Sequence, residues 1–107
     1  MTIFDSREDS FEKKFAHDET LRFKVTARRN KLLGLWAAEQ LGYAGERADA
    51  YAKEVVASDF EAPGDDDVLQ KVLKDLHEGG ISITGAQVRT EMDSLMQTAK
   101  KQIMEQA

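Results

Sequence analysis

The sequence predicts an all-α protein, a four-helix bundle with a mobile, potentially helical N-terminal arm. Apolar residues recur at the three- and four-residue spacing of a helix over four segments, and glycine- or proline-marked turns separate these segments. The run Ile-Ser-Ile at 81–83 is too short and too isolated for a sheet, and 107 residues suffice for one core. We therefore expect an arm over residues 1–19 and one bundle over residues 20–107.

The longest helix pattern covers residues 20–41 and contains Trp36, the only tryptophan. Its C-terminal half is apolar on nearly all sides, so other helices must cover it from several directions. It is the expected centre of the bundle, and Gly42, which can adopt the left-handed conformation, is its expected end. Its N-terminal half is basic, because residues 20–38 contain five cations and no acid.

Three shorter helix patterns follow the central one, over residues 46–61, 65–78 and 85–104. The first ends before Pro63, which restricts the residue that precedes it. The second begins with three aspartates, whose charge suits the positive end of a helix dipole, and it ends at Gly79 and Gly80. The third begins with a capping-box spacing between Thr84 and Gln87. Such short connections favour antiparallel neighbours.

The arm has three phenylalanines at i, i+7 and i+11 on one helical face, but it lacks a strong helix start. One helix from residue 4 to residue 41 would be about 57 Å long, whereas a helix of about 15 residues spans about 22 Å. The arm would then extend beyond the bundle with its phenylalanines uncovered. We therefore expect the arm to be disordered or loosely helical when the protein is free. The alternative is that it folds back on its own bundle as a fifth short helix.

The composition excludes several classes of protein. A net charge of −5 is typical of an acidic domain and argues against nucleic-acid binding. The absence of cysteine excludes disulfides and thiolate chemistry. No apolar run approaches the length of a membrane span, and the N-terminus lacks the apolar core of a signal peptide. We expect a cytoplasmic protein that does not insert into a membrane and is a monomer when free.

Neither catalysis nor a metal site is predicted. His17 and His77 are far apart, and neither has a second ligand at i+3 or i+4 on an inward face. No serine lies in a nucleophile elbow. The aspartates Asp65, Asp66 and Asp67 lack the glycine and distal glutamate of a calcium loop, so we interpret them as helix N-terminal charge. We expect no enzyme activity, no catalytic residue and no required cofactor.

The densest cationic cluster consists of Arg28, Arg29 and Lys31. Guanidinium groups match phosphate oxygens, so this cluster is a candidate anion contact. A glycine-rich phosphate loop is absent, which excludes a Walker-type site. The alternative is a solvated face whose cations pair with acids of the helices at 46–61 or 65–78.

Two segments carry a family resemblance, RRNKLLGLWAAE within residues 11–42 and DFEAPGDDDV within residues 52–72. They are similar to the zeta subunit of alphaproteobacterial rotary F-type ATP synthases, a small ATPase-inhibitor family. The resemblance extends over nearly the whole chain and fades after about Gly79. It implies a four-helix bundle whose mobile N-terminal segment enters the catalytic head of the synthase and blocks ATP hydrolysis. It also implies a peripheral position at the inner membrane, through the synthase.

Under this resemblance the inhibitory segment is residues 1–19, and ADP or ATP is a regulatory ligand of the bundle. The resemblance does not identify the nucleotide contacts, so the candidates remain the residues of the densest cationic cluster, Arg28, Arg29 and Lys31. A second hypothesis is an adenine-nucleotide-binding sensor or adaptor bundle without inhibitory activity, in which the arm only completes the fold. The residues that we expect to contact the head all lie in the arm: Ile3, Phe4, Arg7, Phe11, Lys13, Lys14 and Phe15.

Overall fold

A computed structural model describes residues 3–61 and 64–106, with the side chains of residues 3–7, 60 and 61 left out. Helices form nearly all of this part of the chain, and it contains no strand, which confirms the all-α prediction. The four helices expected after the arm begin and end within two residues of the predicted bounds. The helices are α1 Ile3–His17, α2 Glu19–Gln40, α3 Glu46–Glu61, α4 Asp65–Glu78 and α5 Gly85–Gln106.

The predicted helix ends are stabilised by local hydrogen bonds. After α2, Gly42 has a φ of +80°, and the Tyr43 amide donates to the Ala38 carbonyl at 2.8 Å. This is the left-handed helix end for which glycine is suited. Before α5, the Gln87 amide donates to Thr84 Oγ1 at 3.1 Å, and the Thr84 amide donates to Gln87 Oε1 at 2.9 Å. The predicted capping box is therefore confirmed.

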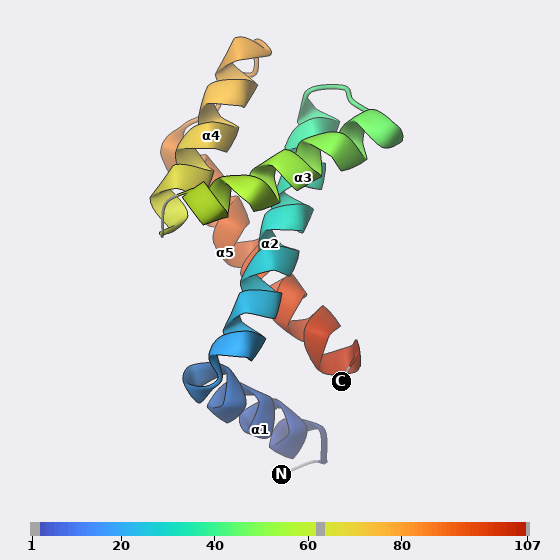
Figure 1. The fold of residues 1–107 in the computed structure, drawn as a ribbon, viewed down its shortest axis with the longest axis vertical. Helices are drawn as coiled ribbons and strands as arrows, with labels where there is room; N and C mark the ends of the chain where they lie inside the picture. Colours follow the sequence, from blue (N-terminus) through green and yellow to red (C-terminus); the bar gives the residue numbers. More distant parts are fainter. Residues whose placement is uncertain (1–2, 62–63, 107) are drawn as a thin grey trace.

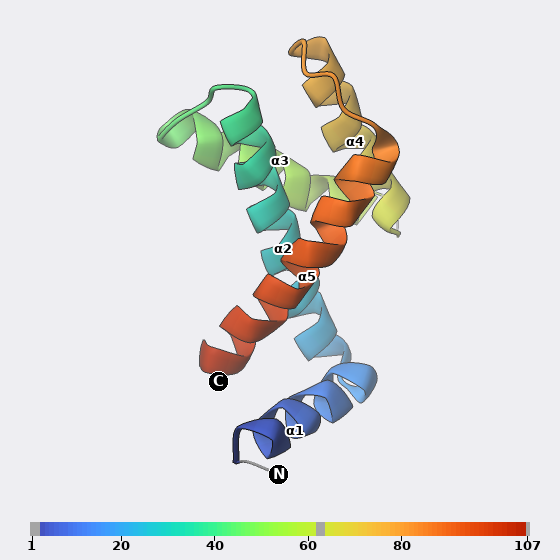
Figure 2. The same cartoon turned by 180° about the vertical axis from the view of Figure 1, so that it is seen from behind.

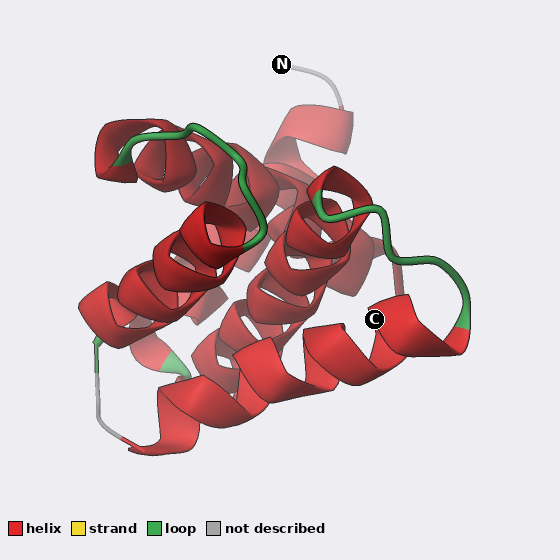
Figure 3. Ribbon diagram, turned by 90° about the horizontal axis from the view of Figure 1, so that it is seen from above, coloured by secondary structure: helices red, strands yellow, loops and turns green. Residues whose placement is uncertain are grey.

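Helix α2 is the centre of the molecule, as expected, and it contacts each of the other four helices. Figures 1 and 2 show that α3 and α5 cross α2 on different sides. Seen from above, the helices are joined by short loops (Figure 3). The expectation of antiparallel neighbours is wrong for α3, which runs across α2. Small residues permit this close crossing, because a Cβ on Gly34 would lie only 2.6 Å from the Cα of Ala52.

The main core lies between α2, α3, α4 and α5, and no described side chain of α1 belongs to it. Trp36 packs against this core, as expected for the only tryptophan. The side chains of the main core come from the apolar helix faces that the helical period predicts. Its buried members are Leu33, Ala37, Ala38, Tyr51, Val55, Val68, Leu69, Val72, Leu76, Val88 and Met92.

A smaller core lies between α1, the N-terminal half of α2 and the C-terminal half of α5. Helices α1 and α2 are not continuous, because Asp18 adopts an extended conformation and its carboxylate accepts a hydrogen bond from the Leu21 amide. Asp18 thereby caps a new helix and lets α1 change direction, so that α1 lies near the C-terminus of α5 (Figures 1 and 2). The buried members of this core are Phe11, Val25, Ala99 and Met104.

The structure therefore differs from the expectation of an extended arm with uncovered phenylalanines. Phe11 is only 7% exposed, and this arrangement corresponds to the alternative in which the arm folds back as a fifth helix. The physical reason is the Asp18 cap, which ends the helix that would otherwise extend beyond the bundle. Mobility of the arm in the free protein stays a prediction.

Candidate functional site

Helix α1 presents two different surfaces. Phe11 is buried and Phe15 is half-buried, and both pack toward α2 and α5. Lys13 and Lys14 are exposed. The face of α1 that the sequence assigned to a partner is thus partly occupied by the bundle, and its two lysines are accessible. Three further predicted contacts belong to α1, with side chains outside the described ones: Ile3, Phe4 and Arg7.

A charged seam borders the apolar contact between α1 and α5. Lys100 of α5 places its Nζ 3.5 Å from Glu12 Oε2 and 4.3 Å from the centre of the Phe15 ring. An ion pair and a cation–π contact thus connect one lysine to two residues of α1. The seam forms a groove of about 310 Å³, and its other charged lining residues are Glu8, Asp9 and Lys101.

The predicted anion cluster does not form one surface. Arg28 donates to Gln102 of α5 at 2.8 Å. Arg29 is 2% exposed, and its Nη2 donates to Asp65 Oδ1 at 2.7 Å. Lys31 is exposed. Consecutive helix positions point about 100° apart, so neighbours in sequence face different parts of the molecule. For Arg29 the structure shows the alternative, a cation that pairs with an acid of the helix at 65–78.

Arg29 joins a network that connects α2, α4 and α5. Its hydrogen bond to Asp65 holds the pKa of that carboxyl below its usual range, and burial opposes this shift. Arg89 of α5 lies 3.9 Å from Asp65 and donates to Asp66 at 2.8 Å. Two aspartates of the first turn of α4, Asp65 and Asp66, therefore pair with arginines. Within residues 3–61 and 64–106, no group of histidines and carboxylates could hold a metal ion.

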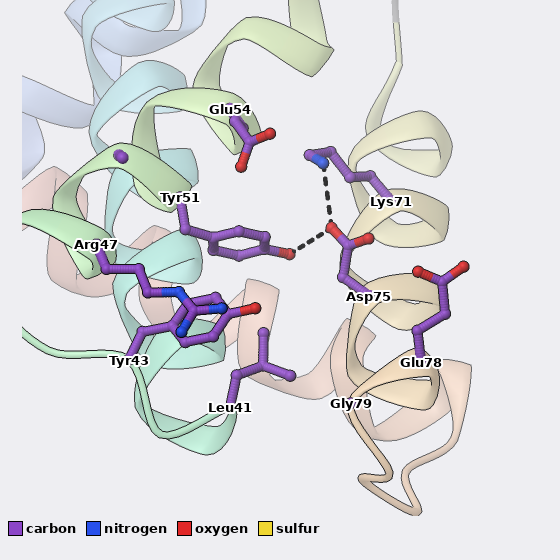
Figure 4. Close-up of a pocket in the computed structure, with 10 residues that line it drawn as sticks. Leu41, Tyr43, Arg47, Tyr51, Glu54, Lys71, Asp75, Glu78 and Gly79 are labelled. Carbon is purple, nitrogen blue, oxygen red and sulfur yellow. Dashed lines mark hydrogen bonds and ion pairs between the residues drawn. The ribbon is translucent and has the colours of Figure 1, made fainter.

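A second candidate site is a pocket of about 450 Å³ lined by residues of α3, α4 and the turn after α2 (Figure 4). Tyr51 Oη donates to Asp75 Oδ2 at 2.8 Å, and Lys71 Nζ donates to the same oxygen at 3.1 Å. The Tyr43 ring meets the Tyr51 ring edge-on, with centres 6.0 Å apart. The Arg47 guanidinium lies over Tyr43, 3.8 Å from the ring centre. Two aromatic rings and two cations therefore line one pocket.

The electrostatics of this pocket keep its central phenol neutral. Burial raises the pKa of Tyr51, and the hydrogen bond to Asp75 raises it further. Tyr51 is thus a hydrogen-bond donor, and Asp75 is shared between it and Lys71. The pocket also contains acids that oppose anion binding: Glu54, Asp75 and Glu78.

Sequence reasoning did not identify this pocket. Tyr43 lies in a turn, and Tyr51 belongs to the apolar stripe of a helix, so each has an ordinary structural explanation. The available signal was Lys71 and Asp75, whose i, i+4 spacing predicts an ion pair next to the apolar face of their helix. That signal alone does not show that α3 supplies a tyrosine to the pair.

Comparisons with known proteins agree with the fold. A solution NMR structure is 49% identical in sequence, covers 81% of this chain and 99% of its own, and has a TM-score of 0.72. The search of curated proteins found no match. No helix in the described ranges, 3–61 and 64–106, has the length and apolar character needed to cross a membrane. The family model of the ATPase inhibitor subunit zeta matches residues 1–102. The chain therefore belongs to the ATPase inhibitor subunit zeta family.

Proposed function

We propose that this chain inhibits ATP hydrolysis by inserting α1 into the catalytic head of an F-type ATP synthase. Membership of an ATPase-inhibitor family supports the inhibitory role and an interaction with the synthase. One observation supports α1 as the inserting element. It is a separate helix, and none of its side chains from residue 8 onward belongs to the main core, so it can leave the bundle without opening that core.

Insertion would move the phenylalanine face of α1 from one apolar site to another. Burial of a phenylalanine is worth roughly 1.5–3 kcal/mol, but Phe11 and Phe15 already gain part of this free energy by packing in the bundle. Net affinity must therefore come from residues that the bundle leaves accessible, such as Lys13 and Lys14. Because α1 is helical before binding, it loses less backbone entropy than a disordered arm would.

In this mechanism the chain obstructs rotation and supplies no bond chemistry. The bundle remains outside the head and limits how far α1 can enter. Its position at the inner membrane would follow from attachment to the synthase. The inhibitory contacts would be the arm residues predicted above, with Lys13 and Lys14 meeting acidic or carbonyl groups of the head.

The test is hydrolysis by purified catalytic head in the presence of designed variants. Deletion of residues 1–17 retains the Asp18 cap and should abolish inhibition, while circular dichroism shows a folded bundle. Lys13→Glu/Lys14→Glu should weaken inhibition at least tenfold. The matched control is Lys24→Glu/Lys53→Glu, two exposed lysines of α2 and α3, which should inhibit like wild type. A truncated bundle that inhibits as well as the full chain would overturn the proposal.

A second candidate function is adenine-nucleotide binding on the bundle, the sensor or adaptor hypothesis. The pocket of Tyr43, Arg47, Tyr51 and Lys71 favours it, because rings can stack on a base and cations can meet phosphates. Titration with ADP, followed by amide chemical shifts, tests it. Saturable shifts around Arg47 that Arg47→Ala removes would support this pocket. Shifts around Arg28, Arg29 and Lys31 would support the site expected from sequence, and the absence of saturable shifts would reject both.

A further inference from the structure

The inhibitory helix and the bundle share one contact, which we call the latch: Phe11, Glu12 and Phe15 of α1 against Val25 of α2 and Lys100 and Met104 of α5. Phe11 is 7% exposed in this contact. A side chain buried to this degree cannot also be buried in a partner. If α1 acts through its phenylalanine face, the docked position and the inhibiting position exclude each other.

Lys100 stabilises only the docked position. Its side chain is 17% exposed, and its Nζ interacts with both Glu12 and the Phe15 ring. Both contacts end when α1 leaves, and neither involves the main core. An exposed ion pair and a cation–π contact are each modest, but one lysine makes both here.

The charges beside the latch also stabilise the docked position of α1. Glu8 and Asp9 of α1 line the groove opposite Lys101 of α5. Acids on one helix and lysines on the other attract, and this attraction weakens with salt. The connection between α1 and α2 lies at Asp18, which caps α2 by accepting a hydrogen bond from the Leu21 amide. Undocking of α1 therefore leaves that cap in place.

We propose that docking of α1 on the bundle is an autoinhibited state, and that release of the latch precedes inhibition of the ATPase. The inference rests on the proposed function of α1. When the competent state is only a fraction of the population, apparent affinity falls by that fraction. A change in the bundle that weakens the latch should therefore strengthen inhibition, although the sequence of α1 is unchanged.

The first test is Lys100→Ala in the full-length chain. It should lower the concentration for half-maximal inhibition by roughly threefold to tenfold. Amide exchange of residues 8–17 should become faster in the same variant. The control is Lys101→Ala, the neighbouring exposed lysine, which should have a smaller effect on both measurements. Unchanged or weaker inhibition by Lys100→Ala would overturn the inference.

The second test fixes the latch shut. The chain has no cysteine, so Glu12→Cys/Lys100→Cys creates the only two thiols, and a short thiol-reducible crosslinker can join them. The linked protein should not inhibit, and reduction should restore inhibition. Each single-cysteine variant, treated with the same reagent, is the control for the chemistry.

The two proposals fail differently. Inhibition by the linked protein equal to that by its reduced form would show that α1 need not undock, and it would overturn the latch alone. Inhibition by the chain lacking residues 1–17 would overturn the role of α1 itself.

Discussion

Arg29 and Asp65 form an ion pair that joins the middle of α2 to the first turn of α4, with 2.7 Å between Nη2 and Oδ1. The two partners have different environments, since Arg29 is 2% exposed and Asp65 is 45% exposed. Loss of Asp65 would leave a buried guanidinium for which Asn30 is the remaining side-chain acceptor among the described side chains. Loss of Arg29 would leave a carboxylate that water can reach. Removal of Asp65 should therefore cost more stability than its exposed fraction of 45% indicates.

Asp65→Ala should destabilise the protein by about 2–4 kcal/mol, because it leaves a buried charge without its counterion. The control is Asp66→Ala in the same helix turn, which removes an exposed partner of Arg89 and should cost less than about 1 kcal/mol. Urea unfolding at pH 7 measures both. Equal losses would show that burial of Arg29 does not determine the energetics.

Acid should remove the contribution of Asp65. Its pKa is lower in the folded protein than in the unfolded chain, chiefly because Arg29 donates to it. A carboxyl with a lowered folded pKa stabilises the fold above its unfolded pKa, about 3.9, and this contribution falls as the pH drops through the folded pKa. The stability difference between wild type and Asp65→Ala should therefore decrease below about pH 4 in urea unfolding at several pH values. A difference that stays constant down to pH 3 contradicts the assignment.

Alkali should destabilise the fold through Tyr51. Burial and the bond to Asp75 raise its folded pKa, so its contribution is complete below the unfolded pKa, about 10, and declines above it. Tyr51→Phe should cost about 0.5–1.5 kcal/mol at pH 7 and should show a smaller further loss above pH 10 than wild type. Tyr43→Phe, in the same pocket, is the control and should keep the decline of wild type. Thermal unfolding from pH 7 to pH 11 gives the comparison.

Gly34→Ala should destabilise the protein by about 1–3 kcal/mol, although alanine favours a helix over glycine by about 1 kcal/mol. The added Cβ would lie 2.6 Å from the Cα of Ala52, and backbone cannot move aside as a flexible side chain can. Gly85→Ala is the control, because its Cβ would lie 3.7 Å from the nearest atom of Leu73. Chemical unfolding should find the control nearly neutral, and a stabilising Gly34→Ala would be incompatible with the close crossing.

Phe11→Ala should weaken inhibition of the ATPase, but by less than its buried surface alone indicates. The substitution removes a contact from the latch as well as from the inhibiting position, so part of the loss cancels. Titration of hydrolysis with Phe11→Ala and Phe11→Ala/Lys100→Ala separates the two effects. The second substitution should strengthen inhibition less in this background than in wild type, because the latch is already weakened. An equal gain in both backgrounds would mean that Phe11 and Lys100 act independently.

The helices and their caps could be predicted because their signals are local. Thr84 and Gln87 form their capping box with each other, and Gly42 needs only its own backbone freedom. The sequence placed the start of the central helix at residue 20, one residue from its observed start at Glu19, but Asp18 was not identified as its cap, because the length argument used one helix continuous through that position. The cap was visible as an aspartate three residues before Leu21, a spacing that suits an N-cap.

The candidate sites were less predictable because they depend on packing between helices. Arg28 and Arg29 are adjacent in sequence, but one reaches α5 and the other is buried against α4. Which cation remains accessible follows from where those helices lie, and no local pattern contains that information. The pocket of Tyr51 and Asp75 likewise exists only because α3 and α4 meet.

The connection at Asp18 also fixes how far α1 can reach from the bundle. Helix α1 has 15 residues, so its far end lies about 22 Å from this connection whatever its direction. Because the connection to α2 is short, α1 can change its direction but not the distance that it reaches. A flexible linker would instead allow insertion to many different depths. In the proposed mechanism the bundle would have to lie at the rim of the head, within about 22 Å of the deepest point that α1 touches. Insertion of residues between His17 and Asp18 would change that depth without altering any contact residue.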